Sequence, residues 1–301
     1  MYLKLNLLKF SRFIYQKLHY FKNFEKSKFY NYFHYFWIIL IGSNHGRRYS
    51  LYLEKKLNII KDTGLSKKIK NKNVIIFIGD SHAEFYGRNY TTNMNNNVLF
   101  LSLWLGPALL TNFSKSAYSI NRSVFFLNKV FRLLGNSNKY HIIFTFGEID
   151  IRTAFYQLLK IFKTFKNSDE LSRNIVQSFN ETIFLIKKKF KSNLDINYYF
   201  KEPTPTTNKN GYIIKNNEDL KRIISSSNDL PVLGSVSERV DWHNTLVKEL
   251  KLNNNNCTFL ELSKDHYSNQ GSINKDFSDD HHITNHKLII EFQNSLNKYY
   301  G

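Results

Sequence analysis

The stretch Val74-Ile75-Ile76-Phe77-Ile78-Gly79-Asp80-Ser81-His82 decides the fold of this chain. Its unbroken apolar run is typical of a strand that is buried on both faces of a parallel sheet. Gly79 permits a sharp turn at the end of the strand, and open α/β sheets place their ligand sites at this carboxyl edge. We therefore expect Ser81 to lie in a cleft where the chain enters a helix.

The Gly79-Asp80-Ser81 turn also has a plain structural interpretation, because these residue types are common in turns and at helix N-caps. A serine hydroxyl is a weak nucleophile unless a base activates it. The segment Asp279-Asp280-His281-His282 near the C-terminus can supply such a base. The two segments together favour catalysis over a simple turn.

Strand-like and helix-like stretches alternate from Val74 onward. This alternation predicts an α/β fold, with three α/β/α layers around a five-stranded parallel, flavodoxin-like sheet. Residues 203–234 are expected to form a long loop with a short helix inside it, and such loops often carry substrate contacts. The expected strands are 74–79, 98–103, 141–146, 195–200 and 257–262, and the expected helices are 119–134, 151–165, 169–190, 236–251 and 283–299.

The chain divides into two parts of different composition. Residues 1–70 are rich in aromatic residues and hold fifteen Lys and Arg against three acidic residues, within a formal net charge of +19 for all 301 residues. Residues 71–301 carry the α/β pattern. We therefore expect one α/β domain preceded by a basic, helical N-terminal extension.

The basic extension has three interpretations. It packs on the main domain with its lysines in water, it contacts an anionic membrane surface, or it binds nucleic acid. The last is the least favoured, and no nucleic-acid partner is expected. The longest apolar run there, residues 35–41, is far shorter than the roughly 20 residues of a membrane-spanning helix. We expect a cytoplasmic protein, with peripheral contact at the inner membrane face as the alternative.

The metal-ligating residues are few. Cys257 is the single cysteine, which excludes an internal disulfide and a cysteine-based metal site. Asp279-Asp280-His281-His282 contains typical metal ligands, but no further cluster accompanies it in the sequence. We expect neither a metal nor another cofactor.

Gly79-Asp80-Ser81 after the first strand and the Asp279-x-x-His282 spacing before the last helix resemble the SGNH, or GDSL-like, hydrolases. The resemblance covers residues 74–298 and implies a serine esterase. In that family the serine of the first block is the nucleophile, which corresponds to Ser81. The resemblance makes His282 the general base and acid, and Asp279 the carboxylate that orients it.

The middle blocks of the family match less closely. Gly106 follows the second expected strand, at the position of a glycine whose backbone N–H helps to bind the oxyanion. The third block is normally Gly-x-Asn-Asp, and here it is Gly147-Glu148-Ile149-Asp150. Ile149 thus replaces the asparagine that donates to the oxyanion, and the loss of one such donor typically costs about two or three orders of magnitude in rate.

Three polar residues complete the expected site. Arg152 is the nearest candidate for the missing oxyanion donor, while Glu148 and Arg152 also have a simpler interpretation as an ion pair at a helix start. Asp80, beside the expected nucleophile, is like Gly106, Glu148 and Arg152 expected to contribute to the oxyanion hole or to substrate binding. Residues 235–244, with Glu238, Arg239, Trp242 and His243, are expected to line the cleft or to form an amphipathic helix face.

The Gly-Glu-Ile-Asp-x-Arg block resembles divergent members of the family among polysaccharide-modifying enzymes. We therefore expect an esterase that removes O-acetyl or other small acyl groups from carbohydrate or cell-surface polysaccharide. Trp104 and Trp242 are candidates for stacking on sugar rings. Two alternatives stay open: an O-acyltransferase that passes the acyl group to a glycan, and a non-catalytic binding module, which the replacement at Ile149 suggests.

Overall fold

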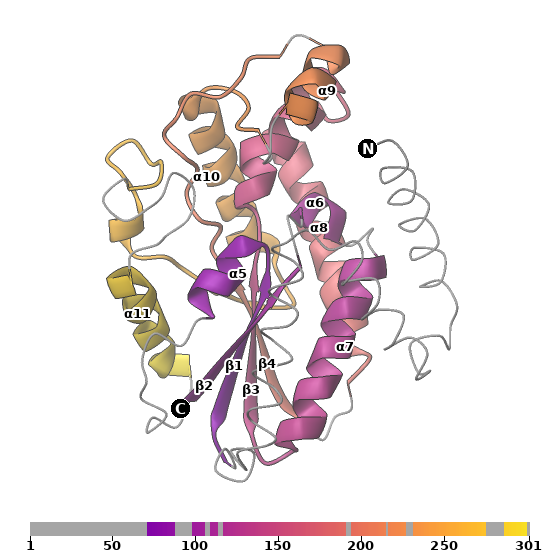
Figure 1. The fold of residues 1–301 in the computed structure, drawn as a ribbon, viewed down its shortest axis with the longest axis vertical. Coiled ribbons are helices and arrows are strands. Elements are labelled where there is room, and N and C mark those ends of the chain that lie inside the picture. The colour runs from indigo at the N-terminus through magenta and orange to yellow at the C-terminus, as the bar shows by residue number, and fades with distance from the viewer. Residues whose placement is uncertain are drawn as a thin grey trace.

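The computed structural model describes residues 71–87, 98–105, 109–113, 117–190, 194–214, 216–226, 231–274 and 286–299. Its five strands are all parallel and form one sheet in the order β2-β1-β3-β4-β5 (Figure 1). This is the flavodoxin-like order, so the predicted fold class, which the resemblance to SGNH hydrolases also implies, is confirmed. The strands are β1 (Asn73–Gly79), β2 (Val98–Trp104), β3 (Lys139–Thr145), β4 (Asp195–Lys201) and β5 (Thr258–Leu260).

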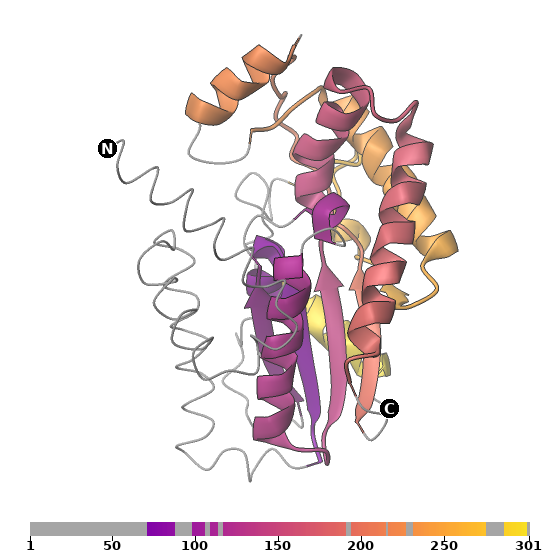
Figure 2. The ribbon, with the colours of Figure 1, turned by 90° about the vertical axis from the view of Figure 1, so that its right-hand side faces the viewer.

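Helices cover both faces of the sheet, as the two views in Figures 1 and 2 show. The predicted N-terminal extension, residues 1–70, lies outside the described residues. The helical elements are α5 (Ser81–Tyr86), α6 (Leu110–Phe113), α7 (Ala117–Leu134), η2 (Asp150–Ala154), η3 (Gln157–Ile161), α8 (Ser168–Lys187), α9 (Asn217–Ser226), α10 (Val236–Asn253), η4 (Lys264–His266), α11 (His286–Ser295) and η6 (Leu296–Tyr299).

The central strand β1 explains the three layers. Successive side chains of a strand point to opposite faces, and all residues from Val74 to Ile78 are fully buried. One alternate set joins the core under α7, α8 and α10, and the other joins the core under α5 and α11. Phe77, for example, has its ring centroid 6.2 Å from that of Tyr86 and 6.4 Å from that of Phe292. An unbroken apolar run is therefore required at this position.

Most of the predicted elements are confirmed, with shifted ends. The third strand covers Lys139–Thr145 rather than 141–146, and the last covers Thr258–Leu260 rather than 257–262. Of the predicted loop 203–234, residues 203–214, 216–226 and 231–234 are described, and they contain the short helix α9. Of the final predicted helix, residues 286–299 are described, as α11 and η6.

The predicted helix 151–165 is confirmed in part: residues 148–161 are helical, and two stretches of the helix, η2 and η3, are π-helical. The carbonyl oxygen of Arg152 accepts a hydrogen bond from Leu233 N (2.9 Å), and Thr153 Oγ1 donates to Pro231 O (2.9 Å). These bonds tie the turn to the long loop. Single π-turns occur frequently at functional sites.

Helix α10 buries the residues whose role the sequence left open. Ser235 is the N-cap and shares a capping box with Glu238. Trp242 and His243 lie on the buried face of the helix. Trp242 packs against Phe155, with ring centroids 6.0 Å apart, and is 6% exposed. The predicted stacking of Trp242 on a sugar ring is therefore wrong.

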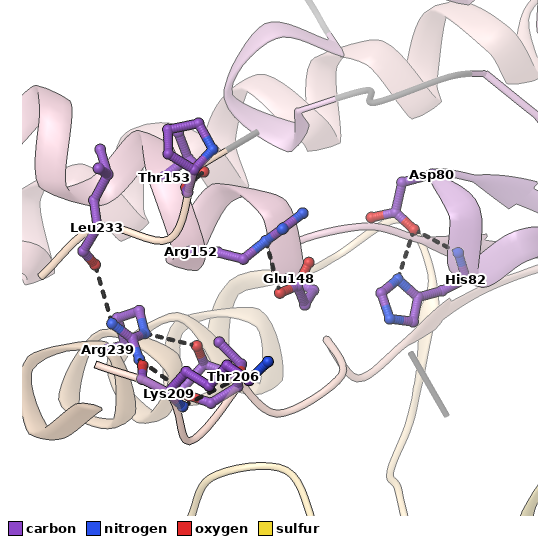
Figure 3. Close-up of polar contacts among 11 residues, drawn as sticks. Asp80, His82, Glu148, Arg152, Thr153, Thr206, Lys209, Leu233 and Arg239 are labelled. Carbon is purple, nitrogen blue, oxygen red and sulfur yellow. Dashed lines mark hydrogen bonds and ion pairs between the residues drawn. The ribbon is translucent and has the colours of Figure 1, made fainter. Parts of the chain in front are cut away.

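Arg239 is fully buried and holds the long loop against α10 (Figure 3). Its Nε donates to Thr206 Oγ1 (3.0 Å), and its terminal nitrogens donate to the carbonyl oxygens of Thr207 (3.0 Å) and Leu233 (3.2 Å). The carbonyl oxygens of Gly234 and Lys209 accept further bonds from it. Both ends of the loop thus depend on this one side chain.

We predict that Arg239→Met lowers the free energy of unfolding by about 3 kcal/mol or more, because several buried carbonyl groups lose their donor at once. Urea unfolding measures the change. Arg222→Met on the exposed face of α9 is the matched control, and its effect should stay within about 0.5 kcal/mol. Equal effects of the two substitutions would contradict this role of Arg239.

Candidate functional site

The site lies where β1, β3 and β4 end. Ser81 follows β1 as the first residue of α5, Glu148 follows β3, and Lys201 is the last residue of β4. Because neighbouring parallel strands end at the same edge of a sheet, these three segments lie together. A cluster of polar side chains thus lies at the edge of the sheet where the sequence predicts a site.

Gly79 determines how the chain leaves β1. It pairs with Thr145 of β3, and a Cβ atom at position 79 would lie 1.9 Å from the carbonyl oxygen of Thr145. Asp80 N donates to that same oxygen (3.2 Å). The backbones of β1 and β3 therefore leave room only for glycine, and the chain turns directly into α5.

Asp80 is fully buried and begins α5 as its N-cap. Its Oδ1 accepts a hydrogen bond from His82 N (2.9 Å) and lies 2.9 Å from His82 Nδ1 (Figure 3). The N-cap interpretation of the turn is thus confirmed for Asp80. Its other oxygen, Oδ2, is buried without a hydrogen-bond partner in the part of the chain that is described.

His82 lies beside Ser81 in sequence but points elsewhere. Consecutive residues of a helix do not face each other, and His82 is buried while Ser81 is partly exposed. Burial alone would lower the pKa of His82, but the carboxylates of Asp80 and, more weakly, Glu148 raise it above its ordinary value. The imidazole therefore favours its protonated form more than a free histidine does.

Glu148 and Arg152 form a buried ion pair, with Arg152 Nε 3.1 Å from Glu148 Oε1. The pair was one of the two interpretations of these residues from sequence. Ile149 between them is 3% exposed and offers only an apolar side chain. Figure 3 shows Glu148 between Arg152 and the Asp80–His82 pair.

Lys201 is a member of the cluster that the sequence analysis missed. Its Nζ donates to the carbonyl oxygen of Glu202 (2.6 Å) and lies 4.6 Å from the ring centroid of Tyr86. Burial lowers the pKa of Lys201 to about 7, against the attraction of the Asp80 and Glu202 carboxylates. The available signal was a lysine directly after the aromatic residues that end an expected strand. A lysine at such a place is rarely buried unless it has a partner.

Asp150 holds the start of α6 in place. Its two carboxylate oxygens accept hydrogen bonds from Leu110 N (2.7 Å) and Thr111 N (2.9 Å) at the start of α6. Burial raises the pKa of Asp150 to about 6, despite these bonds. The carboxylate thereby fixes the chain a few residues after position 106.

Three of the predicted site residues fall outside the described part of the chain: Gly106, Asp279 and His282. Of the others, Asp80 and Glu148 line one hollow. Ser81 follows Asp80 in the chain, and Arg152 is paired with Glu148. The hollow is narrow and is lined by Asp80, His82, Thr145, Phe146, Glu148, Lys201 and Thr204.

The described residues show neither a metal site nor a membrane-spanning helix. Within them, no three metal-ligating side chains lie close enough together to hold an ion. None of the helices they form is long and apolar enough to cross a membrane.

No protein-family model matches the sequence, and no curated protein matches it significantly. Among solved structures, the chain is similar to a candidate platelet activating factor from Streptococcus pneumonia, at 14% identity and a TM-score of 0.45 over 86% of this chain and 100% of that one. It is also similar to a candidate acylhydrolase from Bacteroides fragilis, at 11% identity and a TM-score of 0.42 over 81% and 98% of the two chains. A GDSL-like lipase from Bacteroides thetaiotaomicron follows, at 13% identity and a TM-score of 0.40 over 81% and 95%. These likenesses are distant, so functional inference rests on the side chains of the site.

The low pKa of Lys201 predicts a pH-dependent stability. The unfolded chain, in which the lysine has its usual pKa near 10.5, binds more protons between pH 7 and 10 than the folded protein does. Stability should therefore rise with pH above 7, by about 1 kcal/mol per pH unit from this group. Urea unfolding from pH 7 to 8.5 should show this rise in the wild type and lack it in Lys201→Met. Parallel pH dependences in the two proteins would contradict the assignment.

Proposed function

We propose that this protein is a serine esterase of the SGNH type, with Ser81 as its nucleophile. The observation that carries the proposal is the placement of Ser81, partly exposed at the first position of α5, directly beyond the turn that Gly79 makes possible. Its neighbours Asp80 and His82 are buried and bound to each other. Of these three polar residues, Ser81 is the one that solvent and substrate can reach.

The proposed reaction follows from the resemblance to the family. His282 takes the proton from Ser81 Oγ as this oxygen attacks the acyl carbonyl, and Asp279 orients the imidazole. The same proton passes to the alcohol oxygen as the ester bond breaks and the acyl group stays on Ser81. Water then attacks the acyl-enzyme, gives a proton to His282, and releases the acid while Ser81 regains its proton.

The oxyanion requires donors other than an asparagine at position 149. The backbone N–H groups of Ser81 and Gly106 are the proposed donors, and the Asp150 carboxylate supports this arrangement because it holds the segment that follows Gly106. Arg152 is already paired with Glu148. Its proposed role is to balance the charge of that carboxylate beside the site.

The proposed substrate is an ester of a small acyl group with a carbohydrate. The block Gly147-Glu148-Ile149-Asp150-Ile151-Arg152, which resembles that of polysaccharide-modifying members of the family, supports this class of substrate. We propose hydrolysis as the reaction; transfer of the acyl group to a glycan would use the same acyl-enzyme, and the two differ in the group that accepts it.

We predict that a fluorophosphonate labels the wild type with one adduct per chain, measured by intact mass, and does not label Ser81→Ala. The reagent reports an activated serine without the true substrate. Ser178→Ala on α8 replaces another partly buried serine and is the matched control, which should be labelled like the wild type.

Two results would contradict the proposal: labelling that persists in Ser81→Ala, or a folded wild type that takes no label. The second result would favour a non-catalytic binding module on this fold.

A further inference from the structure

Two neighbouring side chains of the long loop, Tyr212 and Ile213, are exposed although both are large and mainly apolar. Tyr212 is 58% exposed and Ile213 is 79% exposed, the highest fraction of any large hydrophobic side chain in the described part of the chain. Single exposed apolar residues are common on protein surfaces, whereas adjacent ones at a loop tip indicate an interaction site.

The backbone holds these two side chains in a fixed position. Tyr212 N donates to Val232 O (2.9 Å), and Gly234 N donates to Tyr212 O (3.0 Å). The next residue, Ile214, is 6% exposed, and its N–H and carbonyl oxygen both bond with the hydroxyl of Tyr156 (3.0 and 3.2 Å). Ile214 thus points into the core while the two residues before it point outward. A surface held in this way loses little conformational freedom when it binds a partner.

A third exposed apolar side chain lies at the turn between η3 and α8. Phe162 is 48% exposed, and its N–H donates to a carbonyl oxygen at the start of η3 (2.8 Å). This turn and the loop tip are both bound to the segment that leads into α10. Lys160 Nζ lies 3.2 Å from Glu238 Oε1, and Tyr212 bonds to the same segment through its backbone. We call the three exposed side chains, Phe162, Tyr212 and Ile213, the apolar tip.

The segments that carry the apolar tip are basic. Residues 160–166 and 209–222 together hold seven Lys and Arg against two acidic residues. Exposed lysines in these segments are Lys163, Lys166 and Lys221. Apolar side chains surrounded by an excess of positive charge are complementary to a partner that is itself anionic and has an apolar interior.

An anionic membrane surface fits this combination. Apolar side chains gain free energy when they enter the boundary between headgroups and acyl chains, and nearby lysines are attracted to anionic lipids. Tyrosine is enriched at this boundary because its ring is apolar and its hydroxyl is polar. A nucleic acid fits less well, because it is bound by stacking and by phosphate contacts, and Ile213 can make neither.

We propose that the apolar tip docks this protein on an anionic membrane surface. The loop that carries Tyr212 and Ile213 begins directly after β4, and Figure 1 shows its helix α9 at the same end of the molecule as α5. Docking therefore brings the end of the molecule that carries Ser81 toward the membrane. The substrate of the esterase is then an ester held at a membrane surface, a conclusion that rests on the proposed function.

Sedimentation of the full chain with lipid vesicles tests the proposal. The probes are vesicles of phosphatidylcholine alone and vesicles of phosphatidylcholine mixed with phosphatidylglycerol. We expect the wild type to bind the mixed vesicles, to bind them less well as the salt concentration rises, and to bind phosphatidylcholine alone more weakly. The double substitution Tyr212→Ser with Ile213→Ser should weaken binding to the mixed vesicles about ten-fold, and Phe162→Ser about three-fold, because apolar area is lost from the contact.

The matched control is the double substitution Phe184→Ser with Leu185→Ser. Both side chains are 50% exposed, and they lie near the end of α8, whereas Phe162 precedes its start. This control removes a similar apolar area from another part of the surface and should bind like the wild type. All the substituted side chains are exposed, so the variants are expected to fold, and urea unfolding checks that they do.

The proposal is overturned if the wild type does not bind the mixed vesicles, which would favour a protein partner for the apolar tip. It is also overturned if the variant at Tyr212 and Ile213 binds them as tightly as the wild type, which would assign the contact to residues 1–70. Ser81→Ala should bind normally, and this separates the two claims. Vesicle binding without fluorophosphonate labelling rejects the esterase alone, and labelling without vesicle binding rejects the docking surface alone.

Discussion

At Gly79 the backbones of β1 and β3 lie so close together that even a methyl group would collide with the carbonyl oxygen of Thr145. The arrangement of the site depends on this contact. It lets Asp80 N bond to that oxygen, it turns the chain into α5 within one residue, and it leaves Ser81 as the first helical residue. The Thr145 side chain is carried into the same hollow as the Asp80 carboxylate.

Around this turn the protein maintains a cluster of buried charges, which is costly for stability unless each charge is balanced. Asp80 binds His82, Glu148 binds Arg152, and Lys201 gives up part of its charge, with a pKa of about 7. An apolar core would be easier to build at the end of three strands. The polar side chains at this edge of the sheet are instead held in pairs of opposite charge close to Ser81.

Much of the fold could be predicted from the sequence, because a strand buried on both faces must be apolar throughout and because helices alternate with such strands. The turn at Gly79 could also be predicted, because Gly79-Asp80-Ser81 ends an apolar run. Lys201 and His82 were not recognised as members of the site. The role of Arg239 in holding the loop was not recognised either, because it depends on contacts far away in the sequence. Arg239 binds the backbone about thirty residues before it, and no local pattern reveals this. The carbonyl oxygen of Arg152 in η2 likewise accepts a hydrogen bond from the distant Leu233.

The substitution Gly79→Ala tests most directly whether the contact with Thr145 holds the site together. The account predicts that it lowers the free energy of unfolding by about 3 kcal/mol or more, because the added atom meets backbone rather than a side chain that can move aside. Gly135→Ala is the control: it has a positive φ of 79° but open space around it, and should cost only about 1 kcal/mol. A Gly79→Ala protein as stable as the wild type in urea would contradict the account.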